Sequence, residues 1–380
     1  MTLLRNVAVV GFLAAFGCAG GPGSRDALNA GDAARSDGGA AAQAVGGAFV
    51  YVGMTGGEIA LFHLDAATGI LGRRGGASAG RAPSSLVRSA ERGTLVAIDG
   101  ATGQATSFSI DEKSGAPRPV GRASTSAGAA FGATLDDSGR YVLAAHPASG
   151  RVSVLAITQA GALKAIDTFA AGGGARAVAV HPAQVAFVSN FRAGSVSQYA
   201  FNMGTGMLTA RPGAVLELPA GSGPARIVCH PNGRWAFLLD QKLDSIAVFS
   251  YDQDLKALSP ISSQVVSTRA EGSVRGRSRP ADLAISPSGR FLYVTSRGPN
   301  DVAAFAIDAG GTLSLVGRVP GAGGAFGALA VDPSGRILIV ANEGGKSLSV
   351  YPVDPTTGAL GGARIVALAA APLSVLAVRP

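Results

Sequence analysis

The sequence predicts an all-β protein, namely a seven-bladed β-propeller with four antiparallel strands in each blade. Three observations support this fold class: a repeated phrase, alternating apolar strands, and a Gly-containing turn after each strand pair. The clearest copies of the phrase occupy residues 283–297 and 329–343, where Pro-Ser-Gly-Arg precedes a run of apolar residues. A strand-rich unit that repeats after about 45–55 residues is typical of propeller blades.

Seven pairs of apolar strands follow one another along the chain. In several pairs, such as the one that contains Val152-Ser-Val-Leu, apolar and polar residues alternate with the period of half-buried strands. The first five pairs span residues 49–65, 93–111, 141–157, 185–201 and 235–251, and the two quoted phrases are completed by 302–308 and 348–354. Because a short strand precedes each pair and a more polar strand follows it, each blade is expected to contain four strands.

The two ends of the repeat predict how the ring closes. The first copy lacks its innermost strand, whereas the chain ends with an extra strand at 373–378. Pairing of this C-terminal strand with the first blade would close the ring and remove the exposed sheet edges. We therefore expect the C-terminal residues to be ordered and required for folding.

Residues 1–18 have the pattern of a lipoprotein-type signal peptide. Arg5 supplies a positive charge, and Val7–Gly17 is apolar but too short for a stable membrane span. Residues 15–18 resemble the bacterial lipobox, in which the cysteine, here Cys18, is acylated and becomes the mature N-terminus. The alternative is an ordinary cleaved signal peptide in which Cys18 is incidental.

The other domain boundaries follow from composition. Residues 19–47 are rich in Gly, Ala, Ser and Asp without periodicity, which predicts a flexible linker before a propeller domain at residues 48–380. The exported protein is then expected at the bacterial cell envelope, on its periplasmic or surface side. It would touch the membrane only through its N-terminal lipid, as a monomer.

The charge of the chain limits its partners. A formal net charge of +8 and an isoelectric point near 9.9 favour anionic partners or surfaces. No run of Lys and Arg and no aromatic-basic motif is present, so nucleic acid is not an expected partner. Cys18 belongs to the signal peptide and Cys229 to an apolar strand, so no disulfide is expected.

A ligand would bind at the channel mouth, the face of a propeller where inner strands begin and second strands end. The ligand-binding residues expected there are Arg176, Arg226 and Asp282 from strand starts, and His146, Gln241 and Arg297 from strand ends. The candidate catalytic carboxylates at strand ends are Asp240 and Glu343. Several Arg in a concave mouth favour a carboxylate or phosphate ligand, through bidentate hydrogen bonds. The alternative is that they are ordinary loop charges.

No metal and no cofactor are expected. His181 and His230 each precede Pro, in the turn position that Ser286 and Asp332 occupy in other repeats, so we interpret them as structural. No set of His, Asp and Cys has metal-ligand spacing. The Gly-rich stretches are not followed by a predicted helix, so they are not phosphate-binding loops.

Several segments resemble the seven-bladed lactonases related to 6-phosphogluconolactonase. They are residues 223–233, 243–251 and 280–294, with Pro280-Ala-Asp-Leu the most specific feature. The resemblance runs from about residue 49 to residue 380 and is strongest in blades five to seven. It implies a propeller that opens lactones by means of a His, an Arg and a Glu at the channel mouth.

At these three positions the chain departs from the family pattern. Arg176 stands in place of the His, and Gln241 in place of the Glu. Ala225 takes the position of the Arg, so Arg226 is displaced by one residue, which in a regular strand reverses the side chain. A Gln cannot act as a general base, and an Arg does not titrate near neutrality.

Two functions therefore stay open. The favoured one is a lipid-anchored propeller that holds an anionic small molecule or an envelope protein, because binding needs no catalytic residues. The alternative is a lactone hydrolase acting on an acidic sugar lactone. Asp240 or Glu343 would then activate water, while Arg176 or Arg226 would hold the carboxylate or phosphate.

Overall fold

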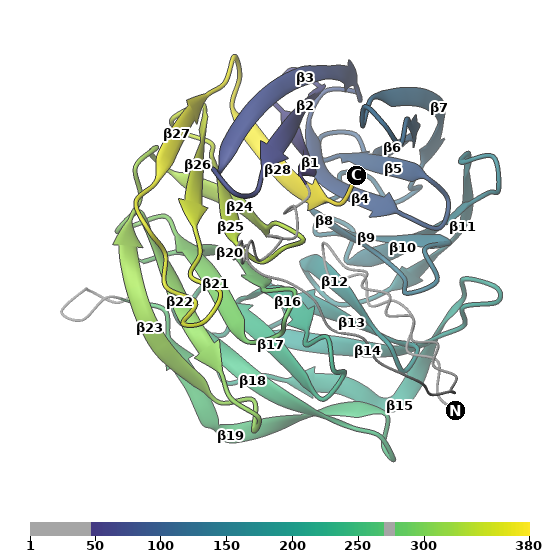
Figure 1. Ribbon diagram of the computed structural model, residues 1–380. Helices are drawn as coiled ribbons and strands as arrows, with labels where there is room; N and C mark the ends of the chain where they lie inside the picture. The colour runs from purple at the N-terminus through teal and green to yellow at the C-terminus, as the bar shows by residue number, and fades with distance from the viewer. Residues whose placement is uncertain (1–46, 270–277) are drawn as a thin grey trace, which may run out of the picture.

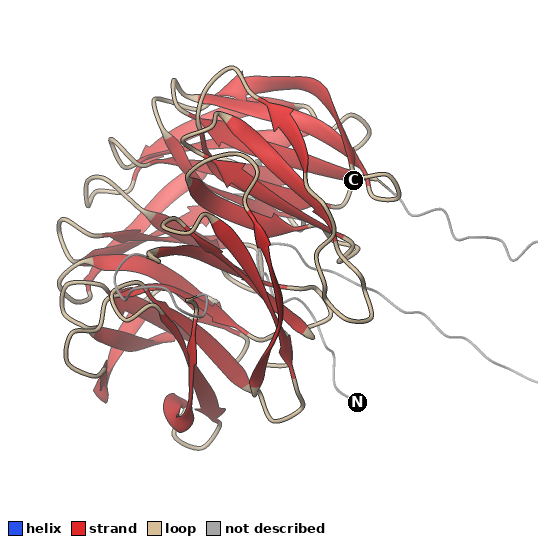
Figure 2. Ribbon diagram, turned by 90° about the vertical axis from the view of Figure 1, so that its left-hand side faces the viewer, coloured by secondary structure: helices blue, strands red, loops and turns tan. Residues whose placement is uncertain are grey.

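The computed structural model describes residues 47–269 and 278–380, which form seven four-stranded antiparallel sheets arranged in a ring (Figure 1). Figure 2 shows this ring turned by 90°, with strands joined by loops and no helix in the described ranges. The described residues thus contain no helix that could cross a membrane. The predicted seven-bladed all-β propeller is confirmed. The predicted signal peptide, Cys18 and the linker up to residue 46 lie outside the described residues.

Each blade is one sheet, and its strands are counted here from the channel outward. Blade one consists of β28 (Pro372–Val378), β1 (Ala48–Met54), β2 (Glu58–Asp65) and β3 (Ile70–Ser78). Blade two consists of β4 (Pro83–Ser89), β5 (Thr94–Asp99), β6 (Gln104–Ile110) and β7 (Pro117–Ser124). Blade three consists of β8 (Gly132–Leu135), β9 (Tyr141–His146), β10 (Arg151–Ile157) and β11 (Leu163–Ala170). Blade four consists of β12 (Ala175–His181), β13 (Val185–Asn190), β14 (Ser195–Phe201) and β15 (Leu208–Glu217). Blade five consists of β16 (Pro224–Cys229), β17 (Trp235–Asp240), β18 (Ser245–Asp252) and β19 (Ala257–Ser267). Blade six consists of β20 (Pro280–Ile285), β21 (Phe291–Ser296), β22 (Asp301–Ile307) and β23 (Leu313–Pro320). Blade seven consists of β24 (Phe326–Val331), β25 (Ile337–Asn342), β26 (Ser347–Pro352) and β27 (Arg364–Ala367).

The hydrophobic core is divided among the blades rather than gathered in one place. Seven clusters of buried apolar side chains each lie between two neighbouring blades. Second strands such as β9 and β25 are buried along their whole length, because neighbouring blades cover both of their faces. Outer strands such as β7 are mostly exposed. Each blade therefore depends on both of its neighbours for burial.

The C-terminal strand closes the ring as the sequence predicts. β28 pairs antiparallel with β1, so the yellow end of the chain lies beside its purple beginning in Figure 1. Val375 and Ala377 pack into the layer against blade seven, whereas Leu376 and Val378 pack into the layer against blade two. One strand thus completes two layers of the core.

Tyrosine hydroxyls connect neighbouring blades. Tyr51 of β1 donates a hydrogen bond to the carbonyl oxygen of Gly115 in the second blade, at 2.7 Å. Gly115 has a φ of 72°, and a Cβ there would lie 2.7 Å from the ring of Phe49, so the turn requires glycine. Burial raises the pKa of Tyr51 to about 12. Tyr293 makes the corresponding bond to Gly358.

Two histidines also connect neighbouring blades, at the C-terminal ends of their inner strands. The Nε2 atoms of His181 and His230 lie 2.7 and 2.9 Å from the carbonyl oxygens of Gly233 and Gly289 in the next blade. Each Nδ1 accepts a backbone N–H from within its own turn. Since the carbonyls require a donor and the N–H groups an acceptor, both imidazoles are neutral in this arrangement. Burial lowers the pKa of both side chains.

Removing residues 372–380 should abolish folding. Burying a Val or Leu side chain stabilises a protein by about 1.5–3 kcal/mol, and the deletion exposes two core layers and the edge of β1. The total stability of a domain is only about 5–15 kcal/mol. We expect insoluble protein or no cooperative melting by circular dichroism. Deleting only Arg379 and Pro380, which are exposed, is the matched control and should melt normally.

Acid should weaken the fold through His181 and His230. The pKa of each of these histidines is lower in the folded protein than the value of about 6.5 in the unfolded chain. Their contribution to stability is therefore complete above about pH 6.5 and is lost as the pH falls further, because the unfolded chain binds protons first. We expect His230→Asp, which copies Asp332 of blade seven, to flatten the pH dependence of the unfolding free energy measured from about pH 7.5 to about pH 5. An unchanged slope would contradict this.

Candidate functional site

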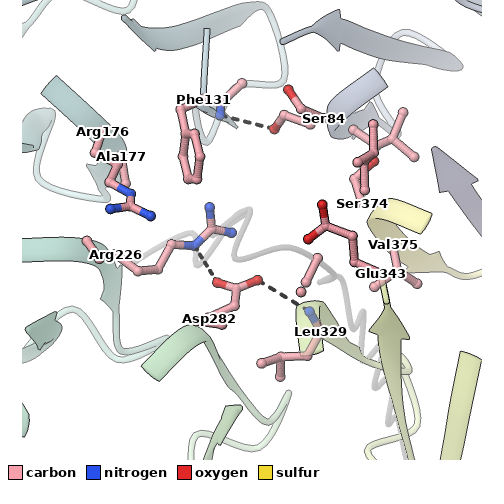
Figure 3. A pocket seen from close by; sticks show the side chains of 18 of the residues that line it. Ser84, Phe131, Arg176, Ala177, Arg226, Asp282, Leu329, Glu343, Ser374 and Val375 are labelled. Atoms are coloured by element: carbon pink, nitrogen blue, oxygen red, sulfur yellow. Dashed lines mark hydrogen bonds and ion pairs between the residues drawn. The ribbon is translucent and has the colours of Figure 1, made fainter. Parts of the chain in front are cut away.

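One cavity lies in the middle of the ring, where the inner strands begin (Figure 3). Its volume is ≈ 320 Å³, near the lower end of the ~300–1,000 Å³ of small-molecule pockets. Residues from the inner strands of all seven blades line it, together with Arg297 and Glu343 from strand ends and Phe131 from the loop before β8. The cavity lies where the sequence predicts the channel mouth.

A β-bulge near the start of the inner strands turns consecutive side chains into this cavity. In β16, Pro224 pairs with Asp240 but Arg226 pairs with Leu239, which leaves Ala225 as the extra residue. Strands β12 and β20 carry the same irregularity. A bulge breaks the alternation of side chains between the two faces. Ala225 and Arg226 therefore both line the cavity, and the reversal expected for Arg226 in a regular strand does not occur.

Arg226 is held in place by Asp282 of the neighbouring blade. Its Nε lies 3.1 Å from Oδ1 of Asp282, whose two oxygens also accept the backbone N–H groups of Leu283 and Leu329. Burial raises the pKa of Asp282, and Arg226 opposes this. The terminal nitrogens of Arg226 point toward the middle of the cavity (Figure 3). Asp282 thus orients a guanidinium toward a ligand.

Glu343 and Arg297 form a second, more exposed pair. The Arg297 Nη2 lies 3.1 Å from Oε2 of Glu343, and its Nε donates to the carbonyl oxygen of Phe326 at 2.7 Å. The side chain of Glu343 is 43% exposed. Its carboxylate projects into the open middle of the cavity (Figure 3). A bound molecule could therefore reach it directly.

Arg176 occupies the bulge of β12 and is enclosed by uncharged groups. Its Nη1 donates to Oε1 of Gln241 at 3.0 Å, and the Nε2 of Gln241 donates to the carbonyl oxygen of Pro280. The guanidinium carbon lies 4.5 Å and 4.6 Å from the ring centres of Phe131 and Phe191. Burial lowers the pKa of Arg176, and the positive charge of Arg297 lowers it further.

Asp240 and His146 do not line the cavity, contrary to the sequence prediction. Asp240 is 4% exposed, and its Oδ1 accepts backbone N–H groups from the loop before β16 and from the loop after β17. His146 is fully buried, with its ring nitrogens bonded to the carbonyl oxygen of Gly128 and to the hydroxyl of Ser153. Both side chains hold loops in place, and neither is positioned for catalysis. Gln241, which the sequence also predicts to bind the ligand, does not line the cavity either and contacts Arg176 from outside it.

Sequence reasoning missed the residues that form the opposite wall. Phe131, Ser84 and Ser374 line the cavity on the side of blades one to three (Figure 3). They could have been found, because Ser84 and Ser374 occupy inner-strand starts, as Arg226 does. Phe131 is 53% exposed, which is unusual for so large an apolar side chain. In the part of the chain that the structure describes, no group of three His, Cys, Asp or Glu could hold a metal ion.

Comparison with known proteins places this geometry in a family. The model of the family described as "Lactonase, 7-bladed beta-propeller" matches residues 49–376. The 6-phosphogluconolactonase of Bacillus subtilis is 26% identical over 238 residues, 59% of this chain and 67% of that enzyme. The 6-phosphogluconolactonase of Formosa agariphila is 24% identical over 204 residues, 49% of this chain and 56% of that enzyme, so the match spans little more than half of its length.

A solved structure of similar shape supports the same relationship. The periplasmic gluconolactonase of Pseudomonas aeruginosa superposes with a TM-score of 0.79 and 26% sequence identity, over 87% of this chain and 99% of that one. The family model and the structural superposition extend over most of the propeller, whereas the matches to these two 6-phosphogluconolactonases cover about half of the chain. Since the family model covers nearly all of the propeller domain, the chain belongs to the lactonase family of seven-bladed β-propellers.

Proposed function

We propose that the protein hydrolyses the lactone of a sugar acid in its central cavity. One observation carries this: a fixed guanidinium, Arg226, and an accessible carboxylate, Glu343, face the same open space (Figure 3). Lactone opening needs a base for water and a positive group for the developing oxyanion. Membership of the lactonase family and the similarity to 6-phosphogluconolactonases and to a gluconolactonase support the proposal.

Glu343 is the better candidate for the base than Asp282. Both oxygens of Asp282 are already used by Arg226 and by two backbone N–H groups. Glu343 uses one carboxylate oxygen in the ion pair with Arg297, and its carboxylate faces the cavity. It is also more exposed than Asp282, with 43% against 13% of its side chain accessible. We therefore assign Asp282 to hold Arg226, and Glu343 to act on water.

The reaction follows from these roles. Glu343 accepts a proton from a water molecule as the water oxygen attacks the lactone carbonyl carbon. Arg226 stabilises the negative charge that develops on the carbonyl oxygen. The carbonyl re-forms as the bond to the ring oxygen breaks, and the protonated Glu343 returns its proton to that oxygen. The product is the open-chain hydroxy acid, and the enzyme returns to its starting state.

Hydrolysis is better supported than partner binding. The sequence alone favours binding, because three positions depart from the family pattern. Arg226 reaches the cavity in spite of its displacement, because the bulge in β16 reorients it. A carboxylate is supplied by Glu343 at the end of β25, in a different blade from the expected Glu. Two of the three departures therefore leave the required chemistry available.

We also propose that the protein is exported and anchored to the cell envelope through lipid on Cys18. The apolar N-terminal stretch and the lipobox-like residues 15–18 support this. So does the name of the Pseudomonas aeruginosa relative, which is called periplasmic. A sugar lactone available outside the cytoplasm would then be the natural substrate.

Glu343→Gln should remove most of the hydrolytic activity. Loss of a general base lowers the rate by roughly a hundredfold to ten-thousandfold. The measurement is kcat/KM on gluconolactone, after subtraction of spontaneous opening, with the melting temperature recorded in parallel. Glu58→Gln is the matched control, because Glu58 also pairs with an arginine but lies away from the cavity. Full activity in Glu343→Gln would rule out this residue as the base.

Cys18→Ser should release the protein from the membrane. Acylation requires the thiol, so the variant should move from the detergent phase to the aqueous phase in a Triton partition experiment and should not incorporate labelled palmitate. Cys229→Ala is the control, since Cys229 is buried inside the propeller and should not affect partitioning. Aqueous partitioning of the unmodified chain would instead support an ordinary cleaved signal peptide.

A further inference from the structure

We propose that the rim around the cavity is a docking surface for an acidic polysaccharide, a long chain built from sugar acids. The rim consists of the loops that lead into the inner strands and the loops that follow the second strands, because both kinds of loop lie at the mouth of the cavity. The docking surface is inferred from the distribution of exposed charge. Only the choice of a sugar polymer among polyanions rests on the proposed function.

The exposed charged residues of the rim all have the same sign. Among the described residues, they are Arg81, Arg192, Lys242, Arg279, Arg297 and Lys346. The carboxylates of the same loops and of the strand ends beside them are withdrawn from solvent. Asp99 and Asp240 are buried, and Glu343 is half-buried and paired with Arg297. The rim therefore faces the solvent as a ring of positive charge.

The opposite face of the propeller is electrically balanced. This turn face carries the loops from inner to second strands and the loops from third to outer strands. Its exposed carboxylates, among the described loop residues, are Glu91, Glu112, Asp254, Asp308 and Asp354. Its exposed cations are Lys113, Arg234, Lys256, Arg290 and Arg336. The positive charge of the rim is therefore not a uniform consequence of the net charge of +8 but is gathered at the mouth.

The linker joins the propeller at the turn face. Gly47 precedes β1, which is the second strand of its blade, and second strands begin at that face. A chain anchored through Cys18, as proposed above, is then attached to its membrane from the side remote from the rim. The rim stays open to polymers of the cell envelope.

The spread of the charges favours a long partner over a small anion. The cavity has a volume of ≈ 320 Å³, so a small molecule inside it contacts the lining residues and leaves most rim cations untouched. A single exposed ion pair is weak, because both ions are hydrated and screened by salt. A chain of carboxylates can contact several rim cations at once, and each contact after the first is intramolecular. A ring of cations thus favours a polyanion.

An aromatic side chain at the same mouth favours a chain of sugars. Phe131 is 53% exposed and lies in the loop before β8, with one contact to the guanidinium of Arg176 (Figure 3). Its remaining surface can pack against the carbon face of a sugar ring. Aromatic and arginine side chains are enriched where proteins bind partners. The proposed substrate, the lactone of a sugar acid, is also of the same chemical class as the monomers of such a chain.

The binding test uses the full-length protein and polygalacturonate in isothermal titration calorimetry. Dextran is the uncharged sugar polymer, and polyglutamate is a polymer of carboxylates without sugar rings. We expect polygalacturonate to bind more tightly than either, with an affinity that falls as the salt concentration rises from about 0.05 M to about 0.5 M. Absence of binding at the lower salt concentration, or binding of polyglutamate that is at least as tight, would overturn the proposal.

Substitutions on two parts of the rim locate the surface. One variant combines Arg81→Gln with Lys346→Gln, and the other combines Arg192→Gln with Lys242→Gln. Each pair should lower the affinity for polygalacturonate severalfold, and all four together should lower it roughly tenfold to a hundredfold. Melting temperatures are recorded in parallel, and the two pairs make the result independent of any one substitution that disturbs folding.

A variant of the turn face is the matched control. It carries Lys113→Gln, Arg234→Gln, Arg290→Gln and Arg336→Gln, and so has the same net charge as the fourfold rim variant. We expect it to keep the affinity of the unmodified protein. An equal loss in the two fourfold variants would mean that binding follows net charge alone, and the docking surface would be abandoned.

The rim variants also separate docking from catalysis. None of their four residues lines the cavity, so kcat/KM on gluconolactone should not change in them. If the protein binds polygalacturonate through the rim but opens no lactone, the docking surface stands and the hydrolase proposal fails. If it opens lactones but the fourfold rim variant binds polygalacturonate as tightly as the unmodified protein, the hydrolase proposal stands and the docking surface fails.

Discussion

The antiparallel pairing of β28 with β1 holds the propeller together. Each blade buries its apolar faces only against its two neighbours, so the interblade layers are complete only when the ring is closed. Because side chains of β28 alternate between the layers against blades seven and two, one strand completes both. The cavity depends on the same pairing, since Ser374 of β28 forms part of its wall. The strand that closes the ring therefore also completes the wall of the cavity.

Within that regular ring, the chemistry arises where the strands are irregular. A bulge near the start of an inner strand turns two consecutive side chains toward the channel instead of one. This is how Arg176, at a bulge, and Arg226, just after one, come to share a cavity although they stand at different positions in their repeats. The chain can thus lack residues at the family's usual positions and still place guanidinium and carboxylate groups together.

The candidate site could be predicted in part, and the errors at His146 and Asp240 have one physical cause. The mouth residues from strand starts, Arg176, Arg226 and Asp282, line the cavity because every inner strand begins there. At strand ends the outcome depends on a single residue. His146 and Asp240 are the last residues of their strands and turn into the blade, whereas Arg297 and Glu343 stand one position further along and face the channel. A shift of one residue reverses a side chain.

The repeat alone establishes the seven blades and the C-terminal strand that closes them, because alternating apolar residues and Gly turns are local features of the chain. Only the folded ring decides which charges meet. Arg226 pairs with Asp282, and Arg297 pairs with Glu343, across blade boundaries. Arg176 instead contacts two phenyl rings and an amide. These pairings depend on bulges and side-chain directions that arise when the blades pack, and such contacts between distant segments leave no periodic pattern in the sequence.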